Sequence, residues 1–234
     1  MILAANFKSN LTRSETTKYL NTVEVYSVEN EIKDELIVFP PASALQESNL
    51  HVSIGAQNAF AVQNGAYTGE LALDQLKEFG ITTILIGHSE RRHVLGESQE
   101  LIAEKFAYYK EQGFRIVYCI GEPLEVREMG NDALLAYLDT QYKGIDLSYK
   151  NLVIAYEPVW AIGTGLTPTL DDVELIHSAI KKDSKAPLLY GGSVKVDNAK
   201  SILALENVDG ILVGSGALNP HDFCSMIRDA DSLK

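Results

Sequence analysis

The stretch that decides the fold spans residues 83–120 and reads TILIGHSERRHVLGESQELIAEKFAYYKEQGFRIVYCI. It begins and ends with short apolar runs of the kind that form strands buried on both faces of a parallel sheet. Between these runs, Ile102, Phe106 and Tyr109 take the i, i+4 and i+7 positions of an amphipathic helix. The stretch therefore predicts one strand–helix–strand unit.

The same alternation continues along the chain in both directions. A second amphipathic stretch begins at Thr169, which can cap a helix together with Asp172, and it carries Val173, Ile176 and Ile180 on one face. Eight units of about 25–30 residues favour a closed (β/α)8 barrel over an open sheet. No GxGxxG motif follows the first strand, which weakens a dinucleotide-binding alternative. The expected strands are residues 2–5, 36–39, 52–56, 83–86, 115–120, 152–156, 188–190 and 210–213.

Length and charge fit one such barrel and exclude several partners. A chain of 234 residues with 46% hydrophobic side chains can bury one large core, so we expect residues 1–234 to form a single domain. The net charge of −12 disfavours binding to nucleic acid or to an anionic membrane surface. We find no export signal and no apolar run of ~20 residues, so we expect a cytoplasmic protein. Cys119 and Cys224 have no metal-ligand spacing and should be free thiols.

Functional groups of such a barrel lie at the carboxyl ends of its strands. The first strand is followed by Asn6 and Lys8, an amide and an ammonium, although a lone Lys is more often a solvated loop residue. The fourth strand is followed by His88 and Ser89. If a helix begins at Ser89, its N–H dipoles oppose protonation of His88. A histidine held in a structural polar network fits the segment equally well.

A carboxylate and a candidate lid follow the sixth strand. Glu157 precedes Pro158, an apolar tip with Trp160 and Ile162, and a Gly-Thr-Gly sequence at 163–165. Proline stiffens one end of this segment, the glycines give freedom at the other, and the apolar tip can exclude water. The alternative is an ordinary loop with a packed Trp.

The last two strands are followed by glycine-rich turns. Gly191 and Gly192 precede Ser193, and Gly214 precedes Ser215. Glycines allow backbone N–H groups to approach an anion, and barrels often bind phosphate at these two loops. Each turn alone is weak evidence, and the two together favour a phosphate site.

Taken together, these motifs resemble the triosephosphate isomerase family, and their order covers nearly the whole chain. The His-Ser-Glu-Arg-Arg and Glu-Pro-Val-Trp segments are highly specific to that family. Two departures are Phe7, where the family usually has Trp, and Ser215, where a second Gly is usual; a Ser N–H can still donate unless its φ is positive. The segments that carry the resemblance are residues 6–8, 86–92, 156–165 and 190–193, with residues 119–122 in support.

The resemblance implies a TIM barrel that interconverts dihydroxyacetone phosphate and D-glyceraldehyde 3-phosphate, in glycolysis and gluconeogenesis, without metal or organic cofactor. In this family Glu157 would move a proton between neighbouring carbons through an enediolate. Neutral His88 would donate to the substrate oxygens, a Glu and His pairing for which the family is known. Lys8 and Asn6 would stabilise the charge that develops on those oxygens.

The resemblance also assigns the substrate phosphate to the backbone N–H groups of Gly163, Ser193, Gly214 and Ser215. Backbone binding suits the chain because Lys8 is the only basic residue that we expect near the site.

The resemblance also implies a role for Glu90 and for one long loop. Glu90 would orient Lys8 or relay protons, although a structural ion pair with a neighbouring Arg fits as well. The loop at residues 55–70 docks in this family into a second subunit near Lys8 and His88, so we expect a homodimer. The residues alone leave a monomer with a surface loop equally open.

Three other functions compete with isomerisation. Lys8 could form a Schiff base in a barrel aldolase. A metal-dependent hydrolase is weaker, because no two of the five histidines have i, i+4 spacing on a helix face. A barrel kept only as a binding module predicts the loss of Lys8, His88 or Glu157, and all three are present.

Overall fold

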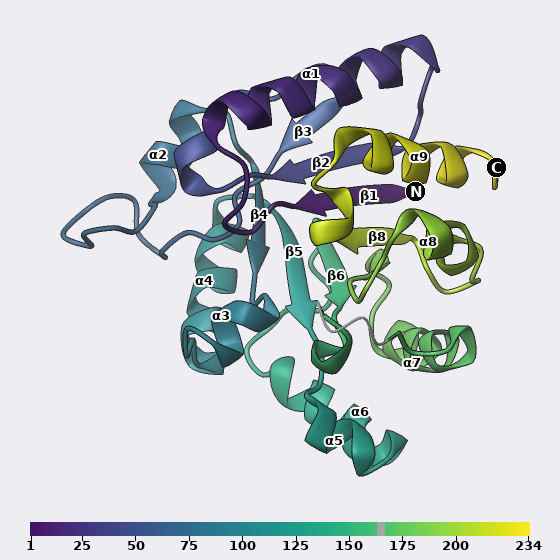
Figure 1. Ribbon diagram of the computed structural model, residues 1–234. Coiled ribbons are helices and arrows are strands. Elements are labelled where there is room, and N and C mark those ends of the chain that lie inside the picture. The colour runs from purple at the N-terminus through teal and green to yellow at the C-terminus, as the bar shows by residue number, and fades with distance from the viewer. Residues whose placement is uncertain (163–166) are drawn as a thin grey trace.

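The computed structural model describes residues 1–162 and 167–234, which form a barrel of parallel strands surrounded by helices (Figure 1). The eight strands in these residues confirm the predicted positions almost to the residue. The third strand is the exception, because it ends at Ile54 and not at Ala56. The strands are β1 Ile2–Asn6, β2 Glu35–Phe39, β3 Val52–Ile54, β4 Thr83–Ile86, β5 Arg115–Ile120, β6 Leu152–Tyr156, β7 Leu188–Tyr190 and β8 Gly210–Val213.

Closure of the barrel depends on a short contact beyond the end of β3. The strand order is β3-β2-β1-β8-β7-β6-β5-β4, so β3 and β4 are the two outer strands of the ladder. Ala56 joins them: its N–H donates to the Thr83 carbonyl at 2.9 Å, and its carbonyl accepts from the Leu85 N–H at 2.8 Å. The predicted (β/α)8 barrel is thereby confirmed.

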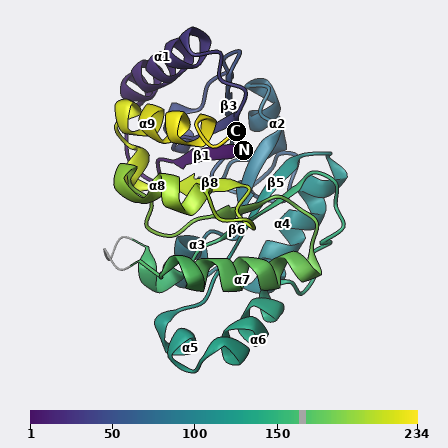
Figure 2. The same cartoon turned by 90° about the vertical axis from the view of Figure 1, so that its right-hand side faces the viewer.

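Helices cover the outside of the barrel, and α1, α9 and α8 lie side by side there (Figure 2). The helix predicted around residues 100–112 is present one residue earlier, with Ser98 as its cap. Thr169 and Asp172 cap each other as predicted, with the Asp172 N–H donating to Thr169 Oγ1 at 3.1 Å. The helices are α1 Arg13–Glu29, α2 Leu73–Glu78, α3 Ser89–His93, α4 Gln99–Glu111, α5 Leu124–Glu128, α6 Asn131–Gln141, α7 Leu170–Asp183, α8 Val196–Leu203 and α9 Pro220–Asp231, with short 3-10 turns η1 Ala42–Ala44, η2 Val159–Ala161 and η3 Ser215–Ala217.

The core has two layers because successive strand residues point to opposite faces. Ala4, Phe39 and Val117 belong to the cluster that fills the barrel, whereas their neighbours Leu3 and Val38 pack outward under the helices. Burial on both faces explains why the strands appear in the sequence as continuous apolar runs. Among the helices of the described residues, none combines the length and apolar character that crossing a bilayer requires.

Candidate active site

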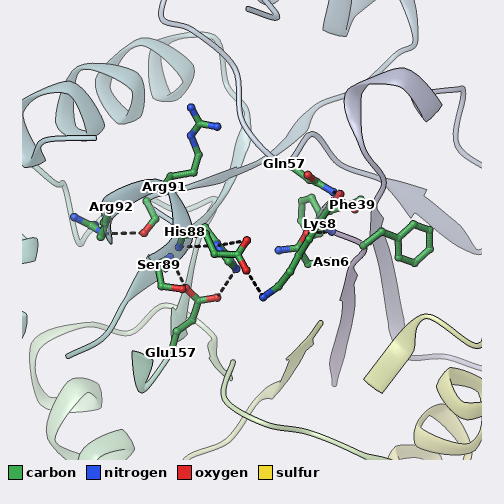
Figure 3. A network of polar contacts seen from close by, with 12 residues as sticks. Asn6, Lys8, Phe39, Gln57, His88, Ser89, Arg91, Arg92 and Glu157 are labelled. Atoms are coloured by element: carbon green, nitrogen blue, oxygen red, sulfur yellow. Dashed lines mark hydrogen bonds and ion pairs between the residues drawn. The ribbon is translucent and has the colours of Figure 1, made fainter. Parts of the chain in front are cut away.

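Polar side chains from three strand ends converge at the carboxyl end of the barrel. Asn6 ends β1, Lys8 follows it, His88 follows β4 and Glu157 follows β6. Figure 3 shows the side chains of Lys8 and Glu157 reaching toward His88 from different sides. The residues that the sequence nominated for chemistry are therefore brought together.

Glu157 is held by backbone contacts on two sides. Its N–H donates to the Ile120 carbonyl at 2.7 Å. A Cβ atom on Gly121 would lie 1.7 Å from the Glu157 carbonyl oxygen, and one on Gly191 would lie 2.8 Å from Glu157 Cγ. Both glycines are therefore required by the close approach of Glu157, which is only 2% exposed and whose side chain has little room to move away from the site.

The Glu157 carboxylate faces the start of helix α3. Its Oε2 atom accepts from the Ser89 N–H at 3.1 Å, and its Oε1 atom lies 3.2 Å from His88 Nε2. His88 caps this helix, and its Nδ1 atom accepts from the Glu90 N–H at 3.2 Å. A ring nitrogen that accepts a hydrogen bond carries no hydrogen, so the hydrogen of the neutral ring lies on Nε2 and points at Glu157. The helix start expected beside His88 is confirmed.

Lys8 has a backbone conformation that non-glycine residues rarely adopt. Its φ is +52°, its N–H donates to Asn6 Oδ1 at 3.0 Å, and its carbonyl accepts from Gln57 Nε2 at 2.8 Å. Strain of this kind costs on the order of 1–3 kcal/mol and persists where surrounding contacts enforce it. Here the contacts fix where the Lys8 ammonium enters the site (Figure 3).

Glu90 pairs with Lys8, with 2.6 Å between Lys8 Nζ and Glu90 Oε1. The alternative, an ion pair with a neighbouring Arg, is not found among the described residues. Arg91 pairs instead with Glu97 at 2.5 Å, and Arg92 donates to the Gly87 carbonyl at 2.7 Å.

A cavity of about 200 Å³ opens beside these groups, next to the turns after β7 and β8. The 3-10 turn η3 begins at Ser215, whose N–H is at the start of a helical turn and has no intrahelical acceptor. Asn198 Nδ2 donates to the Ser193 carbonyl at 3.0 Å and so fixes the other turn. The residues that line the cavity include Asn6, Lys8, His88, Glu157, Gly191, Gly192, Ser193, Lys195, Gly214 and Ser215.

Comparisons with known proteins show the family of this chain. A sequence model of the triosephosphate isomerase family matches residues 1–230. The triosephosphate isomerase of Sulfurimonas denitrificans is 57% identical over 233 residues, which are 100% of this chain and 97% of that protein. Those of a Sulfurovum species and a Nitratiruptor species are 54% and 49% identical, over 97% and 100% of this chain and 99% and 100% of theirs.

The chain belongs to the triosephosphate isomerase family. The family match includes all eight strands and every described residue of the site. It also allows the two departures from the family pattern to be placed. Phe7 is buried and packs edge-on against Tyr19 of α1, with 4.7 Å between ring centroids. Ser215 is not among the residues with positive φ, so its side chain is compatible with the backbone of the turn.

One basic residue that lines the cavity escaped the sequence analysis, and one expected site residue lies outside the described residues. Lys195 lines the cavity two residues after Ser193, so the expectation that Lys8 is the only basic residue near the site is wrong. A Lys directly after a candidate phosphate turn was the available signal. Gly163, expected to donate to phosphate, and the Gly-Thr-Gly end of the proposed lid fall in the segment 163–166 that the structure does not describe.

Trp160, in the described part of the proposed lid, contacts a buried carboxylate. Glu122 Oε1 accepts from Trp160 Nε1 at 2.9 Å and from the Tyr156 hydroxyl at 3.2 Å. Burial raises the pKa of the Glu122 carboxyl, and these hydrogen bonds oppose the rise. Trp160 is thus tied to the end of β5, and not only packed in a loop.

The two cysteines differ in their place: Cys119 is in β5 close to Glu157, and Cys224 is in α9. Both are free thiols, as predicted; both are also buried, and burial raises the pKa of each thiol. Within residues 1–162 and 167–234, no group of three or more His, Cys, Asp or Glu side chains is placed to hold a metal ion.

Proposed function

We propose that this protein interconverts dihydroxyacetone phosphate and D-glyceraldehyde 3-phosphate, the reaction of its family in glycolysis and gluconeogenesis, with residues 1–234 acting as one catalytic domain. The observation that carries the proposal is the approach of His88 Nε2 to Glu157 Oε1 at 3.2 Å, with the Lys8 ammonium at the same cavity. A base, a neutral donor and a cation therefore surround one small space.

In the proposed reaction Glu157 removes the proton from the carbon next to the substrate carbonyl. The electron pair moves to the carbonyl oxygen and forms an enediolate, the hydroxyl proton passes from the neighbouring oxygen to this one, and Glu157 returns its proton to the former carbonyl carbon. His88 Nε2–H and the Asn6 amide donate to the two oxygens, while Lys8 offsets their negative charge; removal of one such donor typically costs ~10²–10³-fold in kcat. Both Glu157 oxygens have partners in this structure, so substrate has to displace one of them.

The phosphate of the substrate would lie at the other end of the cavity. Backbone N–H groups of Ser193, Gly214 and Ser215 are proposed as its donors, together with Gly163 from the segment that the structure does not describe. Lys195 adds a positive charge at that end of the cavity.

A coupled assay with D-glyceraldehyde 3-phosphate tests this function directly. We expect reduction of the dihydroxyacetone phosphate formed, at a rate proportional to enzyme concentration. The aldolase alternative makes a different prediction, namely irreversible labelling of Lys8 when borohydride is added with substrate. Labelling of Lys8 without isomerisation would replace the proposed function by that alternative.

We also propose a homodimer located in the cytoplasm. A second cavity, of about 310 Å³, lies beside Lys8 and His88 and reaches Leu95, which is exposed. The loop between β3 and α2 projects from the barrel (Figure 1), stiffened by a ring contact between Phe60 and Tyr67 with centroids 4.4 Å apart. This loop of one subunit would fill the second cavity of the other, which is the arrangement that the family resemblance implies.

A further inference from the structure

A network of buried and half-buried polar groups lies behind the site and does not line the substrate cavity. It begins at Gly87, the residue before His88. Arg92 Nε donates to the Gly87 carbonyl at 2.7 Å, and Figure 3 shows Arg92 directed away from Glu157. Gly87 has φ +78°, and a Cβ atom there would lie 2.7 Å from Arg92 Nη2. The guanidinium therefore takes the space of the missing side chain and fixes the peptide that leads into His88.

The network continues through the side chains of Gln99 and Tyr118 to the backbone of Gln141. Arg92 Nη1 donates to Gln99 Oε1 at 2.7 Å, and Arg92 Nη2 donates to the Tyr118 hydroxyl at 2.9 Å. Gln99 Nε2 donates to the backbone carbonyl of Gln141 at 2.8 Å, and the Tyr118 hydroxyl donates to the same backbone oxygen. These bonds connect the start of α3 to the end of α6.

At the far end of the network, the Gln141 side chain pairs with the backbone of Gly121, beside Glu157. The Gln141 side chain accepts from the Gly121 N–H at 2.8 Å and donates to the Gly121 carbonyl at 3.0 Å. It thus satisfies two buried backbone groups just beyond the end of β5, where the strand ladder no longer does so. Since Gly121 lies directly against the Glu157 carbonyl, a shift of Gly121 has to move the backbone of Glu157.

We propose that Gln141 is a positioning residue of the isomerisation, which sets where the Glu157 carboxylate lies relative to His88. The inference rests on the proposed function. Gln141 is 4% exposed and is not among the described residues that line the substrate cavity, so its loss should not weaken substrate binding directly. A misplacement of about 1 Å at the reacting groups can cost ~10²-fold in rate. The loss should therefore appear in kcat and not in KM.

A purely structural role for Gln141 has to be separated from this one. Gln141→Met keeps the length of the side chain and removes both bonds to Gly121. Leu138→Ala is the matched control, because Leu138 is buried on the same face of α6, one turn earlier. Its truncation leaves a cavity but removes no hydrogen bond of the polar network. For both variants kcat, KM and the thermal unfolding midpoint are measured.

We expect Gln141→Met to lower kcat by roughly ten- to a hundredfold, with KM within about twofold of wild type. Leu138→Ala should keep a kcat near wild type even where its unfolding midpoint is the lower of the two. If Gln141→Met does not fold, Gln99→Met decides, because Gln99 lies half-buried at the surface and its loss removes one of the two routes from Arg92 to the Gln141 backbone carbonyl, leaving only the route through Tyr118. That variant should lose kcat several-fold at unchanged KM.

Equal kcat in Leu138→Ala and in the Gln variants, with an active wild type, would overturn the positioning role while leaving the proposed function intact. A wild-type protein that does not isomerise triose phosphates would instead remove the proposed function, and this inference with it.

Discussion

His88 and Glu157 meet, with 3.2 Å between Nε2 and Oε1, although they follow strands that are not neighbours in the sheet. Strand β5 separates β4 from β6, so the two side chains meet across the end of β5. Each residue orients the other: the ring hydrogen of His88 points at the carboxylate, and the carboxylate is held beside the ring by the Ser89 N–H. A base and a hydrogen-bond donor are thereby in place before substrate arrives.

Lys195 should contribute to substrate affinity through its charge. For Lys195→Gln we expect KM for D-glyceraldehyde 3-phosphate to rise roughly three- to tenfold at low salt, because an exposed charge pair is worth about 1 kcal/mol. The effect should shrink as ionic strength rises. Lys200→Gln, an equally exposed change on α8 away from the cavity lining, is the control. Identical KM values for the two variants would show that Lys195 does not act on the phosphate.

Thr68 lies in the loop proposed to enter a second subunit, and it is exposed in the single chain. Thr68→Arg should place a desolvated charge in the subunit contact and favour monomers, with lower activity. Sedimentation at low protein concentration measures the mass. Thr17→Arg, at an exposed position of α1, should leave the mass unchanged. A Thr68→Arg protein with unchanged mass and full activity would exclude this loop from the interface.

His177 should make stability depend on pH. It is buried, its Nδ1 atom bonds to the Asn207 carbonyl at 3.0 Å, and burial lowers its pKa from 6.5 to about 4. Between these values the unfolded chain binds the proton and the folded chain does not, so stability falls as pH falls. From pH 7 to pH 4 this group alone should remove about 3 kcal/mol from the free energy of unfolding.

Chemical denaturation at several pH values measures this dependence. His177→Phe should unfold with a shallower dependence on pH across this range, whereas His221→Phe, at an exposed histidine, should keep the wild-type slope. Parallel pH profiles for wild type and His177→Phe would contradict the assignment.

Much of the fold was predictable because its strands are buried on both faces and appear as apolar runs between amphipathic helices. The same regularity predicted which side chains reach the carboxyl end of the barrel, since Lys8, His88 and Glu157 follow strand ends directly. The early end of β3 was not predictable, because Ala56 remains apolar and buried while it pairs with β4 through a single bridge.

Gln141, which the sequence analysis missed, depends on a contact between distant segments. Gln141 follows Leu134 and Leu138 on the buried face of α6, so a polar residue on an apolar face was the available signal. Its partner Gly121 lies 20 residues earlier, and nothing in the sequence pairs the two. Lys195 is exposed and follows a turn, where a Lys is usually solvated.

The central claim is that Glu157 is the base of a proton transfer between neighbouring carbons. Glu157→Asp keeps the carboxylate and withdraws it by one methylene group from a site whose walls, Gly121 and Gly191, cannot follow. The most direct measurement is kcat and KM of this variant in the coupled assay, beside wild type. We expect kcat to fall by ~10²-fold while KM changes far less, because a misplacement of about 1 Å affects the reaction more than binding. A near-normal kcat would show that Glu157 is not the base.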